Sequence, residues 1–385
     1  MIRTFFYGAL ITACSFGAWI IHHSAQDATW ASRQLYPLES LLAYNNQHCQ
    51  GPHQKLIKQA LHAGRKQGSL ASQVAYLSPN GEISACASAP RGEPPNLSAR
   101  YRYASLTKLF TAQAVLTLMA EQAQPLNTPL SQFVPEANSA QDSRWAEVTI
   151  EQLLTHSAGL DRLRSYDPMT RHAVTPWCPG DMEQLKKFTL DFAPGTDYGY
   201  SNLTYCLLGV VVEKLAGQPF ASAMENTLNL NTFGMAFVAG PYLPDEVAYD
   251  FRHAGFYGED YYKYLDFQAL ASSAGLSGTA QGLVQWLAAQ QNAGTLAVTK
   301  PVWPATCDKS KKRDCYGYAM FPYQEKSGGL TVQVQQGYVF GASSSLIFDE
   351  HGGVFVWLGN GSAPKGSAAD NMLGVMYGLL AAHYK

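Results

Sequence analysis

The sequence has few charged residues, since Asp, Glu, Lys and Arg make up 15% of its 385 residues and the formal net charge at pH 7 is −2. The largest group of like charges is a short basic cluster, Lys309, Lys311, Lys312 and Arg313. This content argues against nucleic acid or an acidic surface as partner. Repeats and low-complexity tracts are also missing. With 46% hydrophobic residues, the composition is that of a globular protein.

The sequence also lacks Cys-x-x-Cys pairs and spaced histidine pairs, so nothing indicates a metal site. Beyond the N-terminal segment it has six cysteines, an even number that permits disulfides in an exported chain. We expect Cys307 to pair with Cys315 across a short polar loop, and Cys49 to pair with Cys86. Cys206 lies in an apolar helical run and is expected to be a free thiol in the core.

The N-terminal residues have the pattern of an export segment. Arg3 precedes an uncharged, apolar run from Thr4 to Ile21. Its 18 residues are long for a cleaved signal and near the lower limit for a membrane-spanning helix, so both interpretations stay open. Ile11 to Cys14 also looks like a lipoprotein cleavage box, although the apolar residues that follow argue against it. Because positive residues stay inside, Arg3 places the rest of the chain outside the cytoplasm.

Strand signals occur near both ends of the chain and helix signals between them. Ser72 to Ala89 alternates around the turn pair Asn80-Gly81 and predicts a hairpin. Strand character returns from Ala319 to Trp357. We therefore predict an α/β (α+β) fold with one antiparallel sheet built from both chain ends, flanked by helices, and a helical subdomain inserted at about 123–290. The predicted parts are an N-terminal segment (1–30), a helical lead-in (31–70) and one large domain (71–385).

The segment Ser105-Leu-Thr-Lys108 opens a helical stretch that is apolar on nearly every side and is therefore expected to be buried. Residues three apart share a helix face, so Lys108 can reach Ser105. Burial lowers the pKa of a lysine, which can then take the proton of a serine hydroxyl. Alone the motif is weak, because a second copy occurs at Ser362 to Lys365. The alternative for Ser105 is a helix N-cap beside a solvated lysine.

Two further segments carry polar groups at places where a cleft can form. Tyr200 and Asn202 lie on a turn before an apolar helix, where Tyr200 could move a proton and Asn202 could hold Lys108. The alternative is a core tyrosine beside an N-cap residue. Gln335 to Ser344 forms a strand before a turn, and a glycine there lets substrate approach the backbone N–H groups. The alternative is an ordinary glycine-bearing strand.

In this order the three segments resemble motifs of the class C β-lactamases and the related penicillin-binding carboxypeptidases and esterases. Leu153 to Leu160, Pro194 to Thr196 and Ala274 to Ala280 resemble further stretches of that family, and the similarity covers roughly residues 70–380. The resemblance implies a β-lactamase/transpeptidase-like fold and a serine hydrolase that uses neither a metal nor a cofactor.

The resemblance also implies roles for individual residues. Ser105 matches the acylated nucleophile, Lys108 its base and Tyr200 the second acid/base group. Asn202 matches the residue that contacts both the lysine and the substrate. The oxyanion hole would consist of the backbone N–H groups of Ser105 and Tyr338.

The glycine strand departs from the family pattern. Family members usually have Lys or His where Gln335 stands, two residues before Gly337. Glutamine keeps hydrogen bonding but brings no charge, so anionic β-lactams and carboxylate-ended peptides should bind less well. An alignment shifted by one residue would place Gln336 there, with the same consequence.

Two other features have both a structural and a functional interpretation. His156 falls in a family phrase but not at a catalytic position, and we interpret it as structural. The aromatic stretch from Ala248 to Phe267 could form a wall of the substrate cleft or a structural cluster.

The sequence therefore predicts an exported serine hydrolase, periplasmic or anchored in the inner membrane, that forms an acyl-Ser105 intermediate. Its substrate would be a small-molecule or peptide amide or ester at the cell envelope, such as a peptidoglycan peptide. One alternative is a promiscuous esterase of the same fold. Another is a non-catalytic envelope protein that binds peptides or a partner. Gln335 keeps that last alternative open, whereas the intact set of Ser105, Lys108, Tyr200 and Asn202 argues against it.

Overall fold

The computed structural model describes most of the chain beyond the N-terminal segment. The described residues are 19, 22–23, 27, 29–165, 167, 169, 176–254, 261–300, 303–304, 306–339 and 341–385. The expected export segment, Thr4 to Ile21, lies outside them apart from Trp19. Among the helices of this described part, none combines the length and the hydropathy needed to cross a bilayer.

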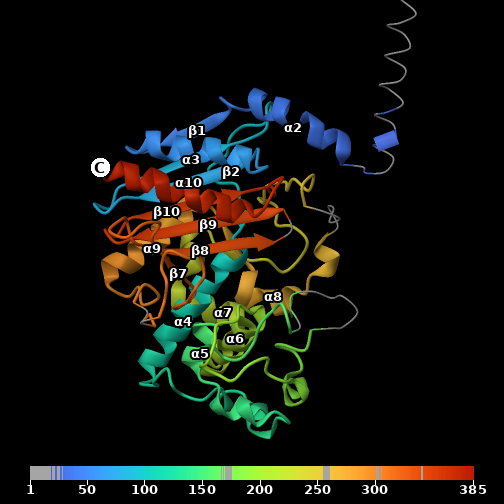
Figure 1. Ribbon diagram of the computed structural model, residues 1–385, viewed down its shortest axis with the longest axis vertical. Coiled ribbons are helices and arrows are strands. Elements are labelled where there is room, and N and C mark those ends of the chain that lie inside the picture. The colour runs from blue at the N-terminus through green and yellow to red at the C-terminus, as the bar shows by residue number, and fades with distance from the viewer. Residues whose placement is uncertain are drawn as a thin grey trace, which may run out of the picture.

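A seven-stranded antiparallel sheet forms the centre of the molecule (Figure 1). Its strand order is β1-β3-β2-β10-β9-β8-β7, so strands from the two chain ends meet where β2 pairs with β10. This confirms the prediction of one sheet built from both ends. The predicted hairpin is also present as β2 and β3. The strands are β1 (Gln47–Gln50), β2 (Ser72–Leu77), β3 (Ile83–Ser88), β7 (Phe321–Tyr323), β8 (Val332–Val339), β9 (Ala342–Asp349) and β10 (Val354–Gly359).

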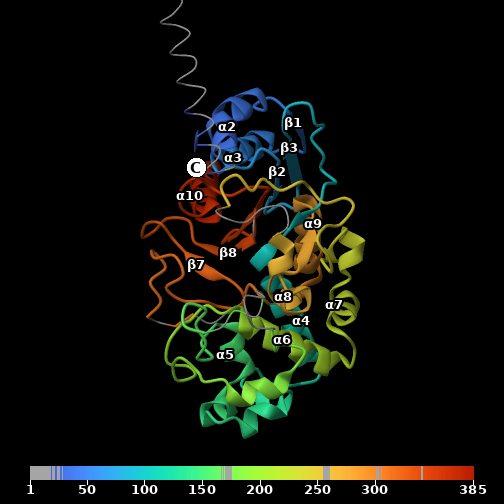
Figure 2. The same cartoon turned by 90° about the vertical axis from the view of Figure 1, so that its right-hand side faces the viewer.

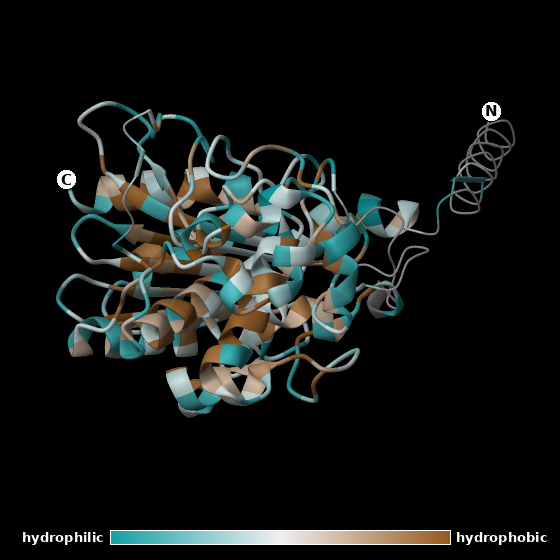
Figure 3. Cartoon of the chain, turned by 90° about the horizontal axis from the view of Figure 1, so that it is seen from below, coloured by the Kyte–Doolittle hydropathy of each residue, from teal (hydrophilic) through white to brown (hydrophobic). Residues whose placement is uncertain are grey.

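Both faces of the sheet are buried at its central strands β2 and β10, which explains why these two strands have apolar residues at consecutive positions. Successive side chains of a strand point to opposite faces. Val74 and Phe355 pack in a core with α3 (Gln54–Lys66) and α10 (Ala368–His383). Ala75 and Val356 pack on the other face, in the core that includes α4 (Thr107–Glu121) and α9 (Ala280–Ala293). Figure 2 shows these layers edge-on, and Figure 3 shows the hydrophobic residues gathered between them.

The helical region packs around α4, which is buried on nearly every side as its sequence predicts. Its neighbours include α6, α7 and α8. The α-helices of this region are α5 (Ile150–Leu154), α6 (Asn202–Ala216), α7 (Phe220–Leu228) and α8 (Phe267–Ala274). Short 3-10 turns are Ala104–Leu106, Leu130–Gln132, Pro135–Ser139, Ser143–Glu147, Met182–Lys187, Leu230–Phe233 and Tyr261–Tyr264.

The edge strand β1 and a second, small sheet were not predicted. The lead-in that looked helical contains α2 (Trp30–Leu42) and α3, but the edge strand β1 lies between them. A second, three-stranded sheet has the order β4-β6-β5. Its strands are very short: β4 (Tyr101–Arg102), β5 (Ala236–Phe237) and β6 (Leu276–Gly278). Segments of two or three residues have no detectable periodicity, so only their tertiary pairing identifies them.

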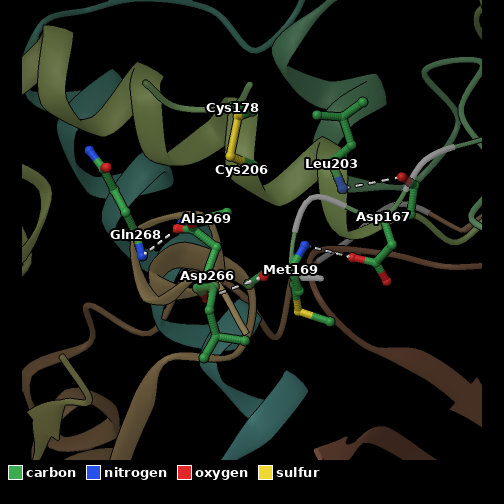
Figure 4. Close-up of a disulfide and its surroundings, with 11 residues drawn as sticks. Asp167, Met169, Cys178, Leu203, Cys206, Asp266, Gln268 and Ala269 are labelled. Atoms are coloured by element: carbon green, nitrogen blue, oxygen red, sulfur yellow. Dashed lines mark hydrogen bonds between the residues drawn. A yellow bond between two sulfur atoms is a disulfide. The ribbon is translucent and has the colours of Figure 1, made fainter. Parts of the chain in front are cut away.

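Three disulfides are present, and one of them corrects a prediction. Cys49–Cys86 and Cys307–Cys315 pair as expected. Cys206 is not a free thiol, because it is bonded to Cys178. Cys206 does lie in an apolar helix, but a loop returns across α6 and buries Cys178 against it, as Figure 4 shows. A contact between a loop and a helix leaves no trace in local sequence pattern.

The double variant Cys178→Ala/Cys206→Ala is expected to lose about 3 to 4 kcal/mol of unfolding free energy. The bond links residues 28 positions apart and so restricts the unfolded chain substantially. Removing Cys307–Cys315, which closes a loop of only 8 positions, should cost less, about 2 to 3 kcal/mol. Denaturant unfolding of both variants checks the order, and an equal or larger loss from the short loop would contradict it.

Candidate active site

Ser105 lies at the junction of the sheet and the helical region, in the 3-10 turn Ala104–Leu106 that leads into α4. The preceding residue, Ala104, has a φ of +49°, a conformation that costs energy for a residue with a side chain. This backbone turns Ser105 toward strand β8, so that its hydroxyl is partly exposed while Lys108 behind it is fully buried.

Lys108 makes three contacts through its amine. Nζ lies 3.2 Å from Ser105 Oγ, 2.7 Å from Asn202 Oδ1 and 2.9 Å from the backbone oxygen of Ser273. Burial lowers the pKa of Lys108, although the nearby Tyr200 and Asp167 act in the opposite direction. A neutral amine has two N–H groups and one lone pair. The charged amine can donate to all three oxygens, and after it loses one proton the two oxygen acceptors use both N–H groups and the lone pair can face Ser105 Oγ.

Asn202 is held in the orientation that this arrangement needs. It is the first residue of α6, and the N-cap Ser201 accepts a hydrogen bond from Leu203 N. The side-chain Nδ2 of Asn202 donates to Asp167 at 2.9 Å, so its oxygen faces Lys108. Sequence reasoning missed Asp167, because it comes from a loop 35 residues earlier that carries no recognisable motif.

Tyr200 is the second side chain that contacts Ser105. Its hydroxyl lies 2.9 Å from Ser105 Oγ. Burial would raise the pKa of Tyr200, but Lys108, the bond to Ser105 and the guanidinium of Arg162 outweigh it, and the pKa is lowered. Arg162 lies 4.8 Å from the ring centre and Lys108 lies 5.0 Å from it. Arg162, and Lys108 whenever its amine is charged, favour the phenolate form.

Strand β8 closes the other side of the site. A Cβ on Gly337 would lie 2.8 Å from Ser105 N and 2.6 Å from the oxygen of Tyr103, so the close approach of β8 requires glycine. Tyr338 is the next residue of β8, and its side chain is exposed. The two segments whose backbone N–H groups were expected to form an oxyanion hole therefore lie side by side.

Gln335 is buried behind this strand edge. Its Oε1 accepts from the hydroxyl of Tyr316 at 2.8 Å and from Gln336 N at 2.9 Å. Burial, followed by the neighbouring Tyr200 and Tyr198, raises the pKa of Tyr316, which therefore stays protonated and donates. The Nε2 of Gln335 has no hydrogen-bond partner among the described residues. Gln335 thus presents an amide donor, without a charge, at the predicted cation position.

A cavity of about 500 Å³ opens in front of Ser105. Tyr200, Gln335, Gly337 and Tyr338 line it together with Ser105, whereas Lys108 and Asn202 lie behind. All seven predicted site residues therefore gather at one place.

The cavity lining also contains two cations that sequence reasoning missed, Arg162 and Arg313. Arg313 forms an ion pair with Asp370 at 2.7 Å and bonds to Gln336 Oε1. The only signal in the sequence was the basic cluster that ends at Arg313.

Comparisons with known proteins identify the family of this chain. A family model described as Beta-lactamase matches residues 55–375. The chain belongs to the β-lactamase family. The putative fimbrial assembly protein FimD, serogroup D, of Dichelobacter nodosus is 38% identical over 371 residues, which cover 94% of this chain and 92% of that protein.

Two further similarities of this β-lactamase family member are informative. The D-alanyl-D-alanine-carboxypeptidase/endopeptidase AmpH of Escherichia coli K12 is 30% identical over 135 residues, 35% of each chain. The solved β-lactamase/D-alanine carboxypeptidase of Yersinia pestis superposes with a TM-score of 0.67 at 18% identity, and the match covers 86% of this chain and 98% of that one. This likeness confirms the predicted β-lactamase/transpeptidase-like fold.

In this protein, His156 and the described aromatic residues Tyr249 and Phe251 pack against neighbouring side chains. His156 is buried, Thr204 Oγ1 bonds to its Nδ1 at 2.9 Å, and its ring packs on Tyr200 with centres 4.5 Å apart. Burial, with Lys108 and Arg162 nearby, lowers the pKa of His156 well below its usual value. A neutral ring that supports Tyr200 agrees with the structural interpretation.

In the aromatic stretch, Tyr249 and Phe251 pack in a small core with Ala342 and do not line the cavity. Part of that stretch, residues 255–260, lies outside the described residues. In the second Ser-x-x-Lys motif, Ser362 is buried at the cavity wall, whereas Lys365 is exposed in the loop before α10.

Proposed function

We propose that this protein is an exported serine hydrolase that transfers the acyl group of an amide or ester to Ser105 and then to water. The observation that carries the proposal is the buried amine of Lys108, 3.2 Å from Ser105 Oγ and hydrogen-bonded to two further oxygen acceptors. Burial lowers the pKa of Lys108. The deprotonated amine can act as a base that takes the proton of Ser105 and makes its hydroxyl a nucleophile.

In the acylation step, Ser105 Oγ attacks the substrate carbonyl carbon while its proton passes to Lys108 Nζ. The backbone N–H groups at Ser105 and Tyr338 stabilise the oxyanion. Tyr200 donates its phenolic proton to the leaving nitrogen or oxygen, and the bond to the acyl carbon breaks. The enzyme then holds an ester at Ser105, a charged Lys108 and a Tyr200 phenolate, which Lys108 and Arg162 stabilise.

In the hydrolysis step, the same two groups act in reverse. The Tyr200 phenolate takes a proton from water, and the resulting hydroxide attacks the acyl carbon. Ser105 leaves and recovers its proton from Lys108. The protons balance over the cycle, because Lys108 and Tyr200 each return to their starting form.

The comparisons support a substrate in the cell envelope. One relative is named a D-alanyl-D-alanine-carboxypeptidase/endopeptidase, and another a putative fimbrial assembly protein. Both names fit the export that the N-terminal sequence predicts. We therefore propose a peptide or a small ester of the envelope as substrate.

The test is intact-mass measurement of the protein after incubation with a fluorophosphonate, a D-Ala-D-Ala peptide, a β-lactam and a short-chain aryl ester. We expect the mass of one fluorophosphonate adduct, and an acyl adduct with at least one substrate class. Acylation by the aryl ester alone would favour the promiscuous esterase. A protein that keeps its native mass with every reagent would support the non-catalytic alternative.

The variant Gln335→Lys is expected to raise the rate of acylation by anionic β-lactams about tenfold, because a charge-assisted hydrogen bond adds roughly 1.4 kcal/mol. Gln335 lines the cavity, so the longer side chain of a lysine at this position can bring a cation to a substrate carboxylate. Stopped-flow acylation measures the effect, and an uncharged ester serves as the control. Equal rates for both proteins on the β-lactam would show that position 335 does not meet the carboxylate.

A further inference from the structure

Exposed apolar side chains concentrate near the N-terminal end of the described chain. Among all the described residues, ten large hydrophobic side chains are exposed, and six of them lie between residues 19 and 44. They are Trp19, Leu35, Leu38, Leu41, Leu42 and Tyr44. Soluble proteins scatter such residues singly, whereas a contiguous group marks an interaction surface.

Four of these residues form one face of helix α2. Leu35, Leu38, Leu41 and Leu42 follow helical spacing, and their exposed fractions are 54%, 54%, 71% and 45%. We call them the leucine face. Tyr36 is the one buried residue of α2, and it lies on the opposite side of the helix.

The opposite side of α2 is attached to the body of the protein. The hydroxyl of Tyr36 donates to the backbone oxygen of Arg65, and Glu39 forms an ion pair with Arg252 at 2.8 Å. Arg33 donates to the backbone oxygen of Arg252. The leucine face is therefore not a core face that has lost its partner, because the core contacts of α2 are already made on the other side.

We propose that α2 lies along a membrane surface with its leucine face in the interfacial layer of the bilayer. The sequence that precedes α2 indicates that the partner of the leucine face is a membrane. The apolar run Thr4 to Ile21 ends eight residues before α2 begins, a distance that keeps the helix close to any bilayer that holds the run. Amphipathic helices bind at this depth through their apolar face.

Aromatic side chains around the junction of the apolar run and α2 fit the same location. The rings of Trp19, near the end of the run, and Trp30, the first residue of α2, lie 4.9 Å apart, and His23 stacks on Trp30 at 5.1 Å. Tryptophan is enriched at the boundary between lipid and water. The leucine face consists of uncharged side chains. Binding of α2 to the bilayer should therefore depend on burial of apolar surface and little on lipid charge or salt.

This placement would bring the catalytic cavity close to the bilayer. Arg252 binds α2 through Glu39, and the next residue, His253, lines the cavity. The ring of Tyr36 packs on His253 with centres 5.8 Å apart. A substrate could then enter the cavity directly from the membrane surface. Figures 1 and 2 show α2 at the periphery of the molecule, at the end opposite α5.

The experiment uses the full chain with Cys14→Ser, because the other six cysteines are in disulfides. A fluorophore sensitive to polarity is attached at Leu38→Cys or, as a matched control, at Leu163→Cys, an exposed leucine of the helical region. Each protein is reconstituted in vesicles of phosphatidylethanolamine and phosphatidylglycerol, and separately in phosphatidylcholine. Lipids brominated in the upper acyl chain report contact with the bilayer, and aqueous iodide reports contact with water. Thermal unfolding confirms that both labelled proteins are folded.

We expect the label at position 38 to shift to the blue and to be quenched by brominated lipid in both kinds of vesicle, with little change at high salt. The label at position 163 should be quenched by iodide alone. Quenching of position 38 by iodide and not by lipid would overturn the proposal. Protection of position 38 from both quenchers would also overturn it, and would indicate that a second copy covers the leucine face. The measurement needs no catalysis, so its result is independent of the proposed hydrolase function.

Discussion

Replacing Ser105 with alanine is expected to abolish covalent labelling by a fluorophosphonate and to lower kcat by roughly 10⁴- to 10⁶-fold. Ser105 Oγ is the hydroxyl that both Lys108 Nζ and Tyr200 OH reach, at 3.2 and 2.9 Å. Alanine removes the atom that forms the acyl bond and leaves the fold around it unchanged. Gel fluorescence and intact-mass measurement report the label directly.

The chain offers a matched control for this variant. Ser362 opens the second Ser-x-x-Lys motif and lines the same cavity, but its lysine is exposed in a loop. The variant Ser362→Ala should therefore keep full labelling. Label that persists in Ser105→Ala, or that disappears in Ser362→Ala, would move the nucleophile away from residue 105.

Replacing Lys108 with methionine is expected to slow acylation by about 10²- to 10⁴-fold, the usual contribution of a positioned general base. Methionine keeps much of the volume of the lysine side chain but has no lone pair that can take the proton of Ser105 at neutral pH. Single-turnover acylation by an activated ester measures the loss. Lys365→Met, at the exposed lysine of the second motif, should have no effect. Equal losses in both variants would contradict the assignment of the base.

The same variant should also change the pH dependence of catalysis. Burial lowers the pKa of Lys108, so the fraction of neutral amine increases as the pH rises toward that lowered value. Acylation by the native protein should therefore slow as the pH falls below it. The limb of the pH profile that belongs to Lys108 should be absent in Lys108→Met.

Stability should respond to pH through the same group. In the native state the charged form of Lys108 is disfavoured, so the unfolded chain binds more protons between the lowered pKa and 10.5. The unfolding free energy of the native protein, relative to Lys108→Met, should therefore rise with pH across this window and level off above it. Denaturant unfolding of both proteins at several pH values checks the sign. A difference that stays constant with pH would show that Lys108 is not desolvated.

The position of Arg313 modifies the expectation drawn from Gln335. The absence of a Lys or His at position 335 suggested weak binding of anionic substrates. The cavity nevertheless contains the guanidinium groups of Arg162 and Arg313, although Asp370 neutralises part of the second. The preference between anionic and neutral acyl donors therefore depends on the balance of these charges, and the Gln335→Lys experiment measures one part of it.

Local patterns in the sequence were sufficient for the central part of the site and for the main sheet. Ser105 lies in the 3-10 turn that runs directly into α4, and Lys108 lies in the first turn of α4, so a spacing of three residues brings them together as helical spacing predicts. Asn202 begins α6, where a turn residue with a polar side chain is expected. The strands at both chain ends are apolar or alternating over six to eight residues, which is long enough to recognise.

The tertiary structure alone decided which distant segments support these residues. Asp167 orients Asn202 and Arg162 covers Tyr200, and both come from a loop whose path no periodicity predicts. The disulfide between Cys178 and Cys206 likewise depends on the path of a loop, although the sequence suggested that Cys206 is a free thiol. The leucine face of α2 is recognisable only because the structure shows which side of the helix is already packed. Helix and strand patterns depend on neighbours within a few residues, whereas these contacts depend on the packing of the whole chain.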